Sequence, residues 1–149
     1  MTIAAILVHK KRQFGDMPVA HVAPTETVAD VAKLLARRRI GAVLVQDAAG
    51  QLLGIVSERD IVRAIAQSGE DCLRHTAAHL MTSNVRTASP AMSVEQAMQT
   101  MSDGRFRHLP VIDGGHLVGI VSIGDVVTAR LRQAAQDVDT LKAYVSGQA

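Results

Sequence analysis

The feature that most constrains this chain is an internal repeat. Leu52–Val62 and Leu117–Val127 share the pattern Leu-x-Gly-Ile-Val-Ser-x-x-Asp-x-Val and are identical at seven of eleven positions. At an offset of 66 residues, Val28–Asp47 aligns with Val94–Asp113, where four of twenty positions are identical and the pattern of apolar positions is largely kept. The chain of 149 residues therefore contains two copies of a unit of about sixty residues.

The same order of secondary structure is predicted in each copy. A hydroxyl residue followed three positions later by an acid or amide predicts a helix start. Short apolar runs on either side of a turn predict a β-hairpin, and a further serine opens another helix. The predicted elements of the first copy are a short strand at Val19–Val22, a helix opened by Thr27, a hairpin of Ala42–Val45 with Leu52–Val56 and a helix opened by Ser57. Those of the second copy are a short strand at Asn84–Thr87, a helix opened by Ser93, a hairpin of Leu109–Ile112 with Leu117–Val121 and a helix opened by Ser122.

These elements predict an α+β fold with two layers, in which each repeat forms a small three-stranded sheet with two helices. One such unit can hardly bury both faces of its sheet, so the two copies are expected to be related by a pseudo-twofold axis and to share a core. The predicted division of the chain is an N-terminal extension at 1–14, a first repeat at 15–66, a linker at 67–80, a second repeat at 81–132 and a C-terminal helical extension at 133–149.

The last helix is predicted to run well past the second repeat, because apolar residues recur there with alternating spacings of four and three. This spacing defines a heptad seam. The seam has to be covered, either by the apolar N-terminal segment Ile3–Leu7 or by the same helix of a second subunit, and we expect a homodimer. The seam residues are Val127, Leu131, Ala134, Val138, Leu141 and Val145.

Composition excludes several classes of protein. Hydrophobic residues make up 48% and charged residues 20% of the chain, as in a folded soluble protein and not a disordered one. Phe14, Phe106 and Tyr144 are the only Phe, Tyr or Trp residues, too few for a surface that stacks nucleic-acid bases. The net charge is +2, and the short basic runs Lys10–Arg12 and Arg37–Arg39 leave nucleic-acid binding as an alternative function that is not favoured.

The location expected for the protein is the cytoplasm. Cys72 is the single cysteine, so no internal disulfide can form, which favours a reducing compartment. The apolar run Ile3–Val8 is far shorter than the ~18 residues of a membrane span, and positive charges follow it where a signal peptide would have them in front. We therefore expect no membrane association.

The repeated motif Gly-Ile-Val-Ser-x-x-Asp, preceded in the second copy by Arg-His-Leu-Pro-Val at 107–111, strongly resembles the CBS domain family over residues 15–132. Two CBS repeats in tandem form a Bateman module, and this chain looks like a stand-alone bacterial module. The resemblance implies binding of adenosine-containing ligands such as AMP, ADP, ATP, NAD(H) or S-adenosylmethionine in clefts between the repeats. It also implies a dimer and a regulatory role in signal transduction, without catalysis.

Chemistry also allows the repeated motif to form a nucleotide site. A strand delivers Ser57 or Ser122 to a helix N-terminus, where free backbone N–H groups and the helix dipole favour a phosphate. The hydroxyl can donate to a phosphate oxygen, and Asp60 or Asp125 can accept hydrogen bonds from a ribose diol. Ser-x-x-Asp is also nearly a capping box, so the spacing alone favours helix caps, whereas the family resemblance favours a ligand site.

The two copies differ in the residues around the motif. Arg59 lies inside the first motif, whereas Gly124 at the equivalent position removes a charge and leaves room for close approach of a ligand or of backbone. Arg107 and His108 precede the facing strand of the second copy only and offer positive charge to phosphates. We expect one good pocket and one doubtful or different pocket, or a shared arrangement in which Arg59 serves a phosphate whose ribose is held by Asp125. The candidate ligand-binding residues are Ser57, Arg59, Asp60, Arg107, His108, Pro110, Ser122, Gly124 and Asp125.

The predicted function is a regulatory module that senses an adenine nucleotide (AMP, ADP or ATP) or NAD(H) and passes a conformational change to an unidentified protein partner. A small nucleotide-handling enzyme is the less favoured alternative. No nucleophile elbow surrounds the serines of a conceivable Ser57–His108–Asp125 triad, and no phosphate loop is present, so we assign no catalytic residue. His75 and His79 lack a third ligand at motif spacing, so we assign no metal site.

Overall fold

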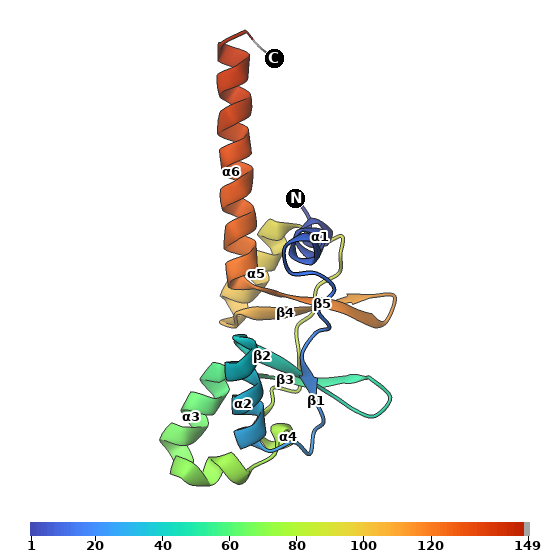
Figure 1. Ribbon diagram of the computed structural model, residues 1–149, viewed down its shortest axis with the longest axis vertical. Coiled ribbons are helices and arrows are strands. Elements are labelled where there is room, and N and C mark those ends of the chain that lie inside the picture. The colour runs from blue at the N-terminus through green and yellow to red at the C-terminus, as the bar shows by residue number, and fades with distance from the viewer. Residues whose placement is uncertain (148–149) are drawn as a thin grey trace. The chain divides into compact units, whose positions relative to one another are not determined.

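The computed structural model describes residues 1–147 and divides into two compact units (Figure 1). The first-repeat unit is Pro18–Val85, and the second-repeat unit joins Met1–Met17 to the chain from Arg86 onward. Helices and two small sheets form the fold, so the predicted mixed class is confirmed. The N-terminal segment belongs to the unit of the second repeat, although the first repeat follows it directly in the sequence.

The first-repeat unit contains a three-stranded sheet, as predicted. β2 lies in the centre, parallel to β1 and antiparallel to β3, and Leu44 pairs with both His21 and Ile55. The elements of this unit are β1 (His21–Val22), α2 (Val28–Arg38), β2 (Ala42–Gln46), β3 (Leu52–Ser57), α3 (Glu58–Ser68), the short 3-10 helix η1 (Gly69–Arg74) and α4 (Ala77–Leu80).

The second-repeat unit has the predicted hairpin but not the predicted third strand. β4 and β5 are antiparallel, and Gly114 and Gly115 in their turn have φ angles of 56° and 81°, the left-handed values that a tight hairpin turn requires. The strand predicted at Asn84–Thr87 does not form, and a single parallel bridge joins Ala88 to Val111. The elements of this unit are α1 (Ile3–Phe14), α5 (Val94–Gly104), β4 (His108–Asp113), β5 (His116–Ser122) and α6 (Ile123–Val145).

Pro110 explains why the third strand is missing. In the first-repeat unit the N–H of Leu44 donates to the carbonyl of Ala20 at 3.1 Å. The equivalent position in the second-repeat unit is Pro110, which has no N–H to donate. The bonds that remain are those of Ala88, which donates to Pro110 O and accepts from Ile112 N, both at 2.8 Å. One proline therefore reduces a strand to a bridge.

Each sheet carries a docked helix that the repeat pattern did not include. α1 docks on the second-repeat unit, and α4 docks on the first-repeat unit with equivalent backbone bonds 74 positions later in the sequence. The N–H of Ile3 donates to Met92 O at 2.9 Å, and the N–H of Ala77 donates to Glu26 O at 2.7 Å. α1 and α4 are therefore structural equivalents that complete the two repeats.

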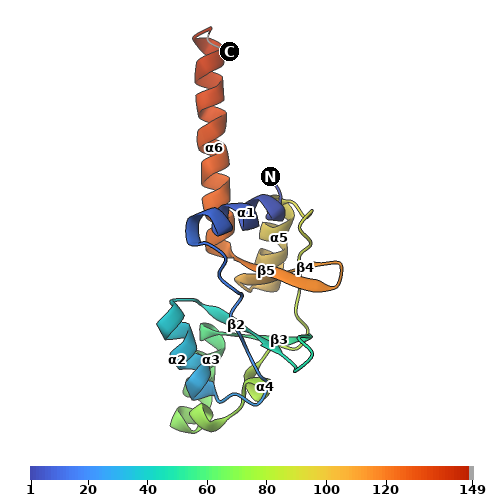
Figure 2. The same cartoon turned by 45° about the vertical axis from the view of Figure 1, so that its right-hand side comes forward.

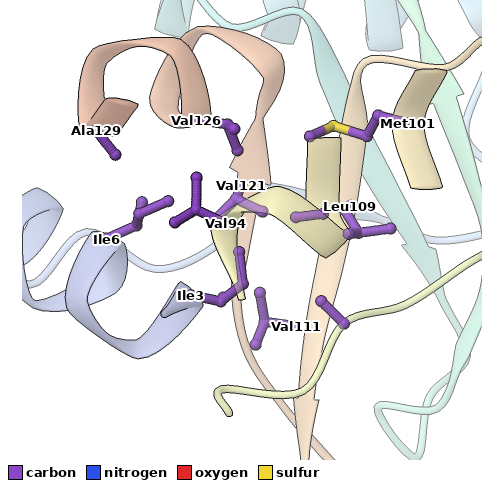
Figure 3. Close-up of a cluster of buried hydrophobic side chains, with 11 residues drawn as sticks. Ile3, Ile6, Val94, Met101, Leu109, Val111, Val121, Val126 and Ala129 are labelled. Carbon is purple, nitrogen blue, oxygen red and sulfur yellow. The ribbon is translucent and has the colours of Figure 1, made fainter. Parts of the chain in front are cut away.

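Each unit buries its own cluster of aliphatic side chains. In the second-repeat unit Ile3 and Ile6 of α1 lie among side chains of the hairpin, α5 and α6 (Figure 3). This cluster comprises Ile3, Ile6, Ala88, Val94, Ala97, Met101, Leu109, Val111, Val121, Val126 and Ala129. The cluster of the first-repeat unit comprises Ala20, Val22, Val28, Val31, Leu35, Val43, Val45, Val56, Ile61 and Ala77. The packing of one repeat's sheet on the other stays a prediction.

A glycine in each hairpin lets the docked segment approach the sheet. A Cβ atom at Gly119 would lie 2.7 Å from Cδ2 of Leu7 in α1, and one at Gly54 would lie 2.6 Å from Sδ of Met81, which follows α4. At Gly54 the added atom would also lie 2.8 Å from the backbone carbonyl of Thr82. The first-repeat hairpin is therefore closed by backbone, whereas the second is closed by a flexible side chain.

α6 continues beyond the body of its unit. Its buried residues, Val126 and Ala129, lie in the first two turns, and Figures 1 and 2 show the C-terminal half standing clear of α1 and α5. The large side chains of the predicted seam are exposed, from 44% at Val127 to 78% at Val145. Residues 148–149 of the predicted C-terminal extension lie outside the described residues.

The N-terminal segment does not cover this seam. Ile3 and Ile6 are buried in the aliphatic cluster instead, so the first of the two predicted covers is wrong. Among residues 1–147, no helix is both long and apolar enough to cross a lipid bilayer.

Alanine at the two hairpin glycines tests the docking of the closing segments. We expect Gly54→Ala to lower the free energy of unfolding by about 2 kcal/mol, because side-chain rotation cannot relieve a clash with a backbone carbonyl. Gly119→Ala should cost about 1 kcal/mol or less, because only the end of Leu7 has to move. Urea denaturation followed by circular dichroism measures both values. An equal or larger loss for Gly119→Ala would show that Thr82 does not limit the space at Gly54.

Candidate functional site

Both copies of the Ser-x-x-Asp motif lie where a β-strand leads into a helix. Ser57 ends β3 and is the N-cap of α3, and Ser122 ends β5 and is the N-cap of α6. We refer to Ser57–Asp60 as the first motif site and to Ser122–Asp125 as the second motif site. In each, the aspartate is the third helical residue, and its carboxylate turns back to the cap.

Each motif forms a complete capping box. In the first motif site, the N–H of Ser57 donates to Oδ2 of Asp60 at 2.8 Å, and the N–H of Asp60 donates to Oγ of Ser57 at 3.3 Å. The corresponding distances in the second are 2.8 Å and 3.1 Å. The capping role is confirmed, and it uses a single oxygen of each carboxylate. Oδ1 of Asp125 is left for a ligand, whereas Oδ1 of Asp60 lies 3.9 Å from Nη1 of Arg63.

Besides the serine N–H, the aspartate Oδ2 accepts from a second donor, and this donor differs between the two motif sites. In the first, the hydroxyl of Ser57 donates to Oδ2 of Asp60 at 3.0 Å. In the second, Nζ of Lys10 in α1 donates to Oδ2 of Asp125 at 2.9 Å and to the carbonyl of Ile120 at 2.9 Å. The side chains of Lys10 and Asp125 are 31% and 22% exposed, so the ion pair is partly shielded from water.

Lys10 is a residue of the second motif site that the sequence analysis did not identify. Its sequence neighbours group it with a basic run on a solvated surface, and 115 residues separate it from Asp125. A local pattern could have found it, because Ile3, Ile6 and Lys10 have spacings of three and four. A helix places such residues on one face, and two of these three are buried.

The facing strand brings Arg107 and His108 to the second motif site, as the hairpin predicts. His108 pairs with Ser122 across β4 and β5, and the N–H of Ile123 donates to the carbonyl of Arg107 at 2.8 Å. The Arg107 side chain is exposed and forms no ion pair within residues 1–147. Pro110 is buried in β4, where its effect is on strand pairing.

The remaining candidates lie in the first turns of α3 and α6. A Cβ atom at Gly124 would have only Oγ of Ser122 nearby, at 3.6 Å, so packing leaves open space there as expected. Arg59 is exposed and belongs to the first-repeat unit together with Ser57 and Asp60. The structure thus gathers the candidates into one group per unit, and the group of the second-repeat unit is the larger.

Several residues of the two basic runs and of the His75–His79 pair form contacts within the chain. Lys11 of the first basic run pairs with Asp16 at 3.1 Å, and Arg38 of the second donates to the carbonyl of Pro18 at 3.0 Å. The rings of His75 and His79 are in contact, with centroids 4.5 Å apart. Among the residues that the structure describes, no three potential ligands are grouped for a metal ion.

An open hollow of about 500 Å³ on the second-repeat unit is formed by α5 and the segment before it. None of the candidate residues lines it. Its lining residues are Arg86, Ser89, Ala91, Met92, Gln96, Gln99, Thr100 and Asp103.

Comparison with known families agrees with this arrangement. The model of the CBS domain matches residues 13–67 and 77–132, which together make up most of the chain. The protein therefore belongs to the CBS domain family and carries two copies of the domain.

Relatives share both the sequence and the fold. The mitochondrial CBS domain-containing protein CBSX3 of Arabidopsis thaliana is 36% identical over 126 residues, which cover 82% of this chain and 61% of that protein. The chain thus spans less than two thirds of the length of this relative. The crystal structure of the CBS-domain containing protein ATU1752 from Agrobacterium tumefaciens has a TM-score of 0.81 and 40% identity, and the match covers 87% of this chain and 92% of that one.

Two similar solved structures contain adenosine compounds. The CBS domain protein PAE2072 from Pyrobaculum aerophilum, complexed with AMP, has a TM-score of 0.71 and 29% identity, covering 84% of this chain and 89% of that one. The CBS domain pair of protein MJ0100, in complex with 5′-methylthioadenosine and S-adenosyl-L-methionine, has a TM-score of 0.74 and 27% identity. The match covers 91% of this chain and 98% of that one.

Removing the two cap hydroxyls tests the hydrogen bonding of the motif sites. Ser57→Ala should lower the free energy of unfolding by about 2 kcal/mol, because its hydroxyl both accepts from and donates to Asp60. Ser122→Ala should cost about 1 kcal/mol, because only the accepted bond is lost. Urea denaturation measures the difference, and threonine at each position should restore most of the loss. A larger loss at Ser122 would contradict the assigned donor pattern.

Proposed function

We propose that this protein is a regulatory module that binds an adenosine-containing nucleotide (AMP, ADP, ATP or NAD(H)) and signals by a conformational change. One observation carries the proposal: a serine hydroxyl, a carboxylate and the ammonium group of Lys10 lie together at the start of α6, and His108 pairs with Ser122 on the adjoining strand. The adenosine compounds in the two solved relatives support the class of ligand.

The second motif site provides groups for the phosphate and the ribose of a nucleotide. The hydroxyl of Ser122 donates to no group within residues 1–147, and the N–H of Gly124 has no acceptor inside its helix, so both can donate to a phosphate. Arg107 is exposed, and its carbonyl accepts from the N–H of Ile123, so its guanidinium is proposed to reach the same phosphate. Oδ1 of Asp125 accepts no hydrogen bond from the described chain and can accept one from a ribose hydroxyl.

The first motif site is the weaker candidate. The hydroxyl of Ser57 is already bonded to Asp60, and the residues of the facing strand there are Gly41 and Ala42, which carry no charge. Arg59 is the one basic side chain within this motif. We therefore assign the principal nucleotide to the second motif site, and a second, weaker site to Ser57, Arg59 and Asp60.

The module is proposed to act without turnover, as a homodimer that passes its change of conformation to a separate protein. Such a ligand transmits a change only if it binds two conformers with different affinity. A similar solved structure from Burkholderia ambifaria, described as a signal-transduction protein with CBS domains, supports a regulatory role, and the exposed seam of α6 supports a dimer. The cytoplasmic location stays a prediction.

Titration of AMP into ligand-free Asp125→Ala tests the site. We expect the affinity to fall at least about tenfold, because hydrogen bonds between a charged carboxylate and a ribose hydroxyl are lost. Gln96→Ala is the matched control, since it removes the same kind of cap from α5 and should leave the affinity unchanged. Calorimetry measures binding, and mass spectrometry of denatured protein identifies any ligand retained through purification.

Unchanged affinity in Asp125→Ala would remove Asp125 from the site. A wild-type protein that releases no adenosine compound and binds none of AMP, ADP, ATP and NAD(H) would refute the proposed function as a whole. Formation of a new product from any of these compounds would favour an enzyme.

A further inference from the structure

Lys10 forms the shorter of the two ion pairs made by the motif carboxylates. Its Nζ lies 2.9 Å from Oδ2 of Asp125, whereas Nη1 of Arg63 lies 3.9 Å from Oδ1 of Asp60. Lys10 stands one turn after the buried Ile6, in a helix of 12 residues that is anchored on its own unit. Helix docking, not a loop, therefore sets the position of this ammonium group.

The ion pair determines whether the hydroxyl proton of the capping serine is available to a ligand. At the first motif site, the hydroxyl proton of Ser57 is used by Asp60. At the second, Oδ2 of Asp125 is bonded to Lys10 and to the backbone N–H of Ser122. A hydroxyl has one proton to donate. With Oδ2 already bonded to Lys10, the proton of Ser122 remains for a ligand.

The first-repeat unit has no counterpart of Lys10 because its docked helix is shorter. α4 has 4 residues, and the residue that would correspond to Lys10 is Asn84, which lies beyond the helix. The carboxylate of the second motif site is therefore balanced by an adjacent ammonium group from another helix. An anionic ligand at the second motif site would therefore face the neutral Lys10–Asp125 ion pair and not an isolated negative charge.

We propose that Lys10 is a specificity-determining residue of the second motif site, and that it makes this site select phosphorylated adenosine ligands over uncharged ones. The inference rests on the proposed function. Without the ammonium group, the Asp125 carboxylate would repel a nearby phosphate with little screening in a partly buried site. Its Oδ2 would also take the proton of Ser122, as Asp60 takes that of Ser57.

Titration of AMP and of adenosine into wild type and Lys10→Met tests this role. We expect wild type to prefer AMP, and Lys10→Met to lose about tenfold or more in AMP affinity while its adenosine affinity changes little. Lys10→Arg should keep the preference, because the charge is kept. Lys11→Met is the matched control, since its ammonium pairs with Asp16 on an exposed surface, and it should leave both affinities unchanged.

Circular dichroism confirms that each variant folds, and Lys10→Gln replaces Lys10→Met if the latter does not. Equal AMP affinity in wild type and the variant would overturn the proposal. A parallel loss of AMP and adenosine affinity would also overturn it, because it would show a packing role. Binding of neither compound by wild type would instead point to failure of the proposed function, and the inference would fall with it.

The exposed seam of α6 carries a second, independent inference. Its large residues are Val127, Leu131, Val138, Leu141 and Val145, all exposed. They lie on a different face of the helix from the buried Val126 and Ala129, so the seam is free to contact another molecule. From residue 134 onward, almost every side chain of α6 is exposed, and an isolated helix of that length is marginal in water.

Charges beside the seam indicate what covers it. In the heptad set by Leu131 at position a, Asp137 occupies g and Lys142 the following e. Two parallel copies in register would place Asp137 of each beside Lys142 of the other, an attractive arrangement. Antiparallel copies with the full seam aligned would place Asp137 against the same residue of the second copy, which is repulsive.

We propose that α6 pairs in parallel with α6 of a second copy of this chain, through the seam from Val127 to Val145. Leu141 then faces Leu141 of the second copy, which an antiparallel pair of the same length does not allow. Thr140, one residue away, faces outward from the seam.

Oxidative cross-linking of Leu141→Cys tests the pairing, because the native Cys72 is buried. We expect Leu141→Cys to give a covalent dimer on a non-reducing gel, and Thr140→Cys, the matched control, to stay uncrosslinked. Light scattering should find a dimer for wild type and Thr140→Asp, and a monomer or a weakened dimer for Leu141→Asp. Absence of a cross-link at Leu141, or equal cross-linking at both positions, would overturn the proposal.

Discussion

The docking of a helix from outside the repeat on each hairpin is the constraint on which the rest of the structure depends. α1 inserts Ile3 and Ile6 into the core of the second-repeat unit, and α4 inserts Ala77 into that of the first. The two helices are anchored by equivalent backbone bonds and closed over equivalent glycines, Gly119 and Gly54. A small hairpin has few residues to bury, so each repeat needs this added layer to bury its apolar face.

Unequal docking helices explain the unequal motif sites. α1 is long enough to reach Asp125 with Lys10, whereas α4 ends before any equivalent residue. The capping boxes are otherwise alike, with the same donors and acceptors in the backbone. The ion pair that distinguishes the second motif site therefore comes from a segment that lies outside both copies of the repeated motif.

The elements that could be predicted from the sequence are those held together by neighbouring residues. The helix starts at Thr27 and Ser93 and the hairpin of Leu109–Ile112 with Leu117–Val121 all depend on contacts across a few residues or one turn. The third strand predicted for the second repeat at Asn84–Thr87 does not form, because Pro110 lacks the N–H that the parallel pairing needs. Pro110 lies 23 residues after Thr87, where the predicted strand would end, so the cause is not in the sequence of the strand itself.

By itself, the sequence determined the two repeats, the helix–hairpin–helix order within each, the cap role of Ser57 and Ser122 and the family, because periodicity, turns and caps are local. The tertiary structure decided which unit receives the N-terminal helix and that Lys10 contacts Asp125. Those outcomes depend on burial of apolar faces between segments more than 80 residues apart, and such burial is non-directional, so no local pattern specifies the partner.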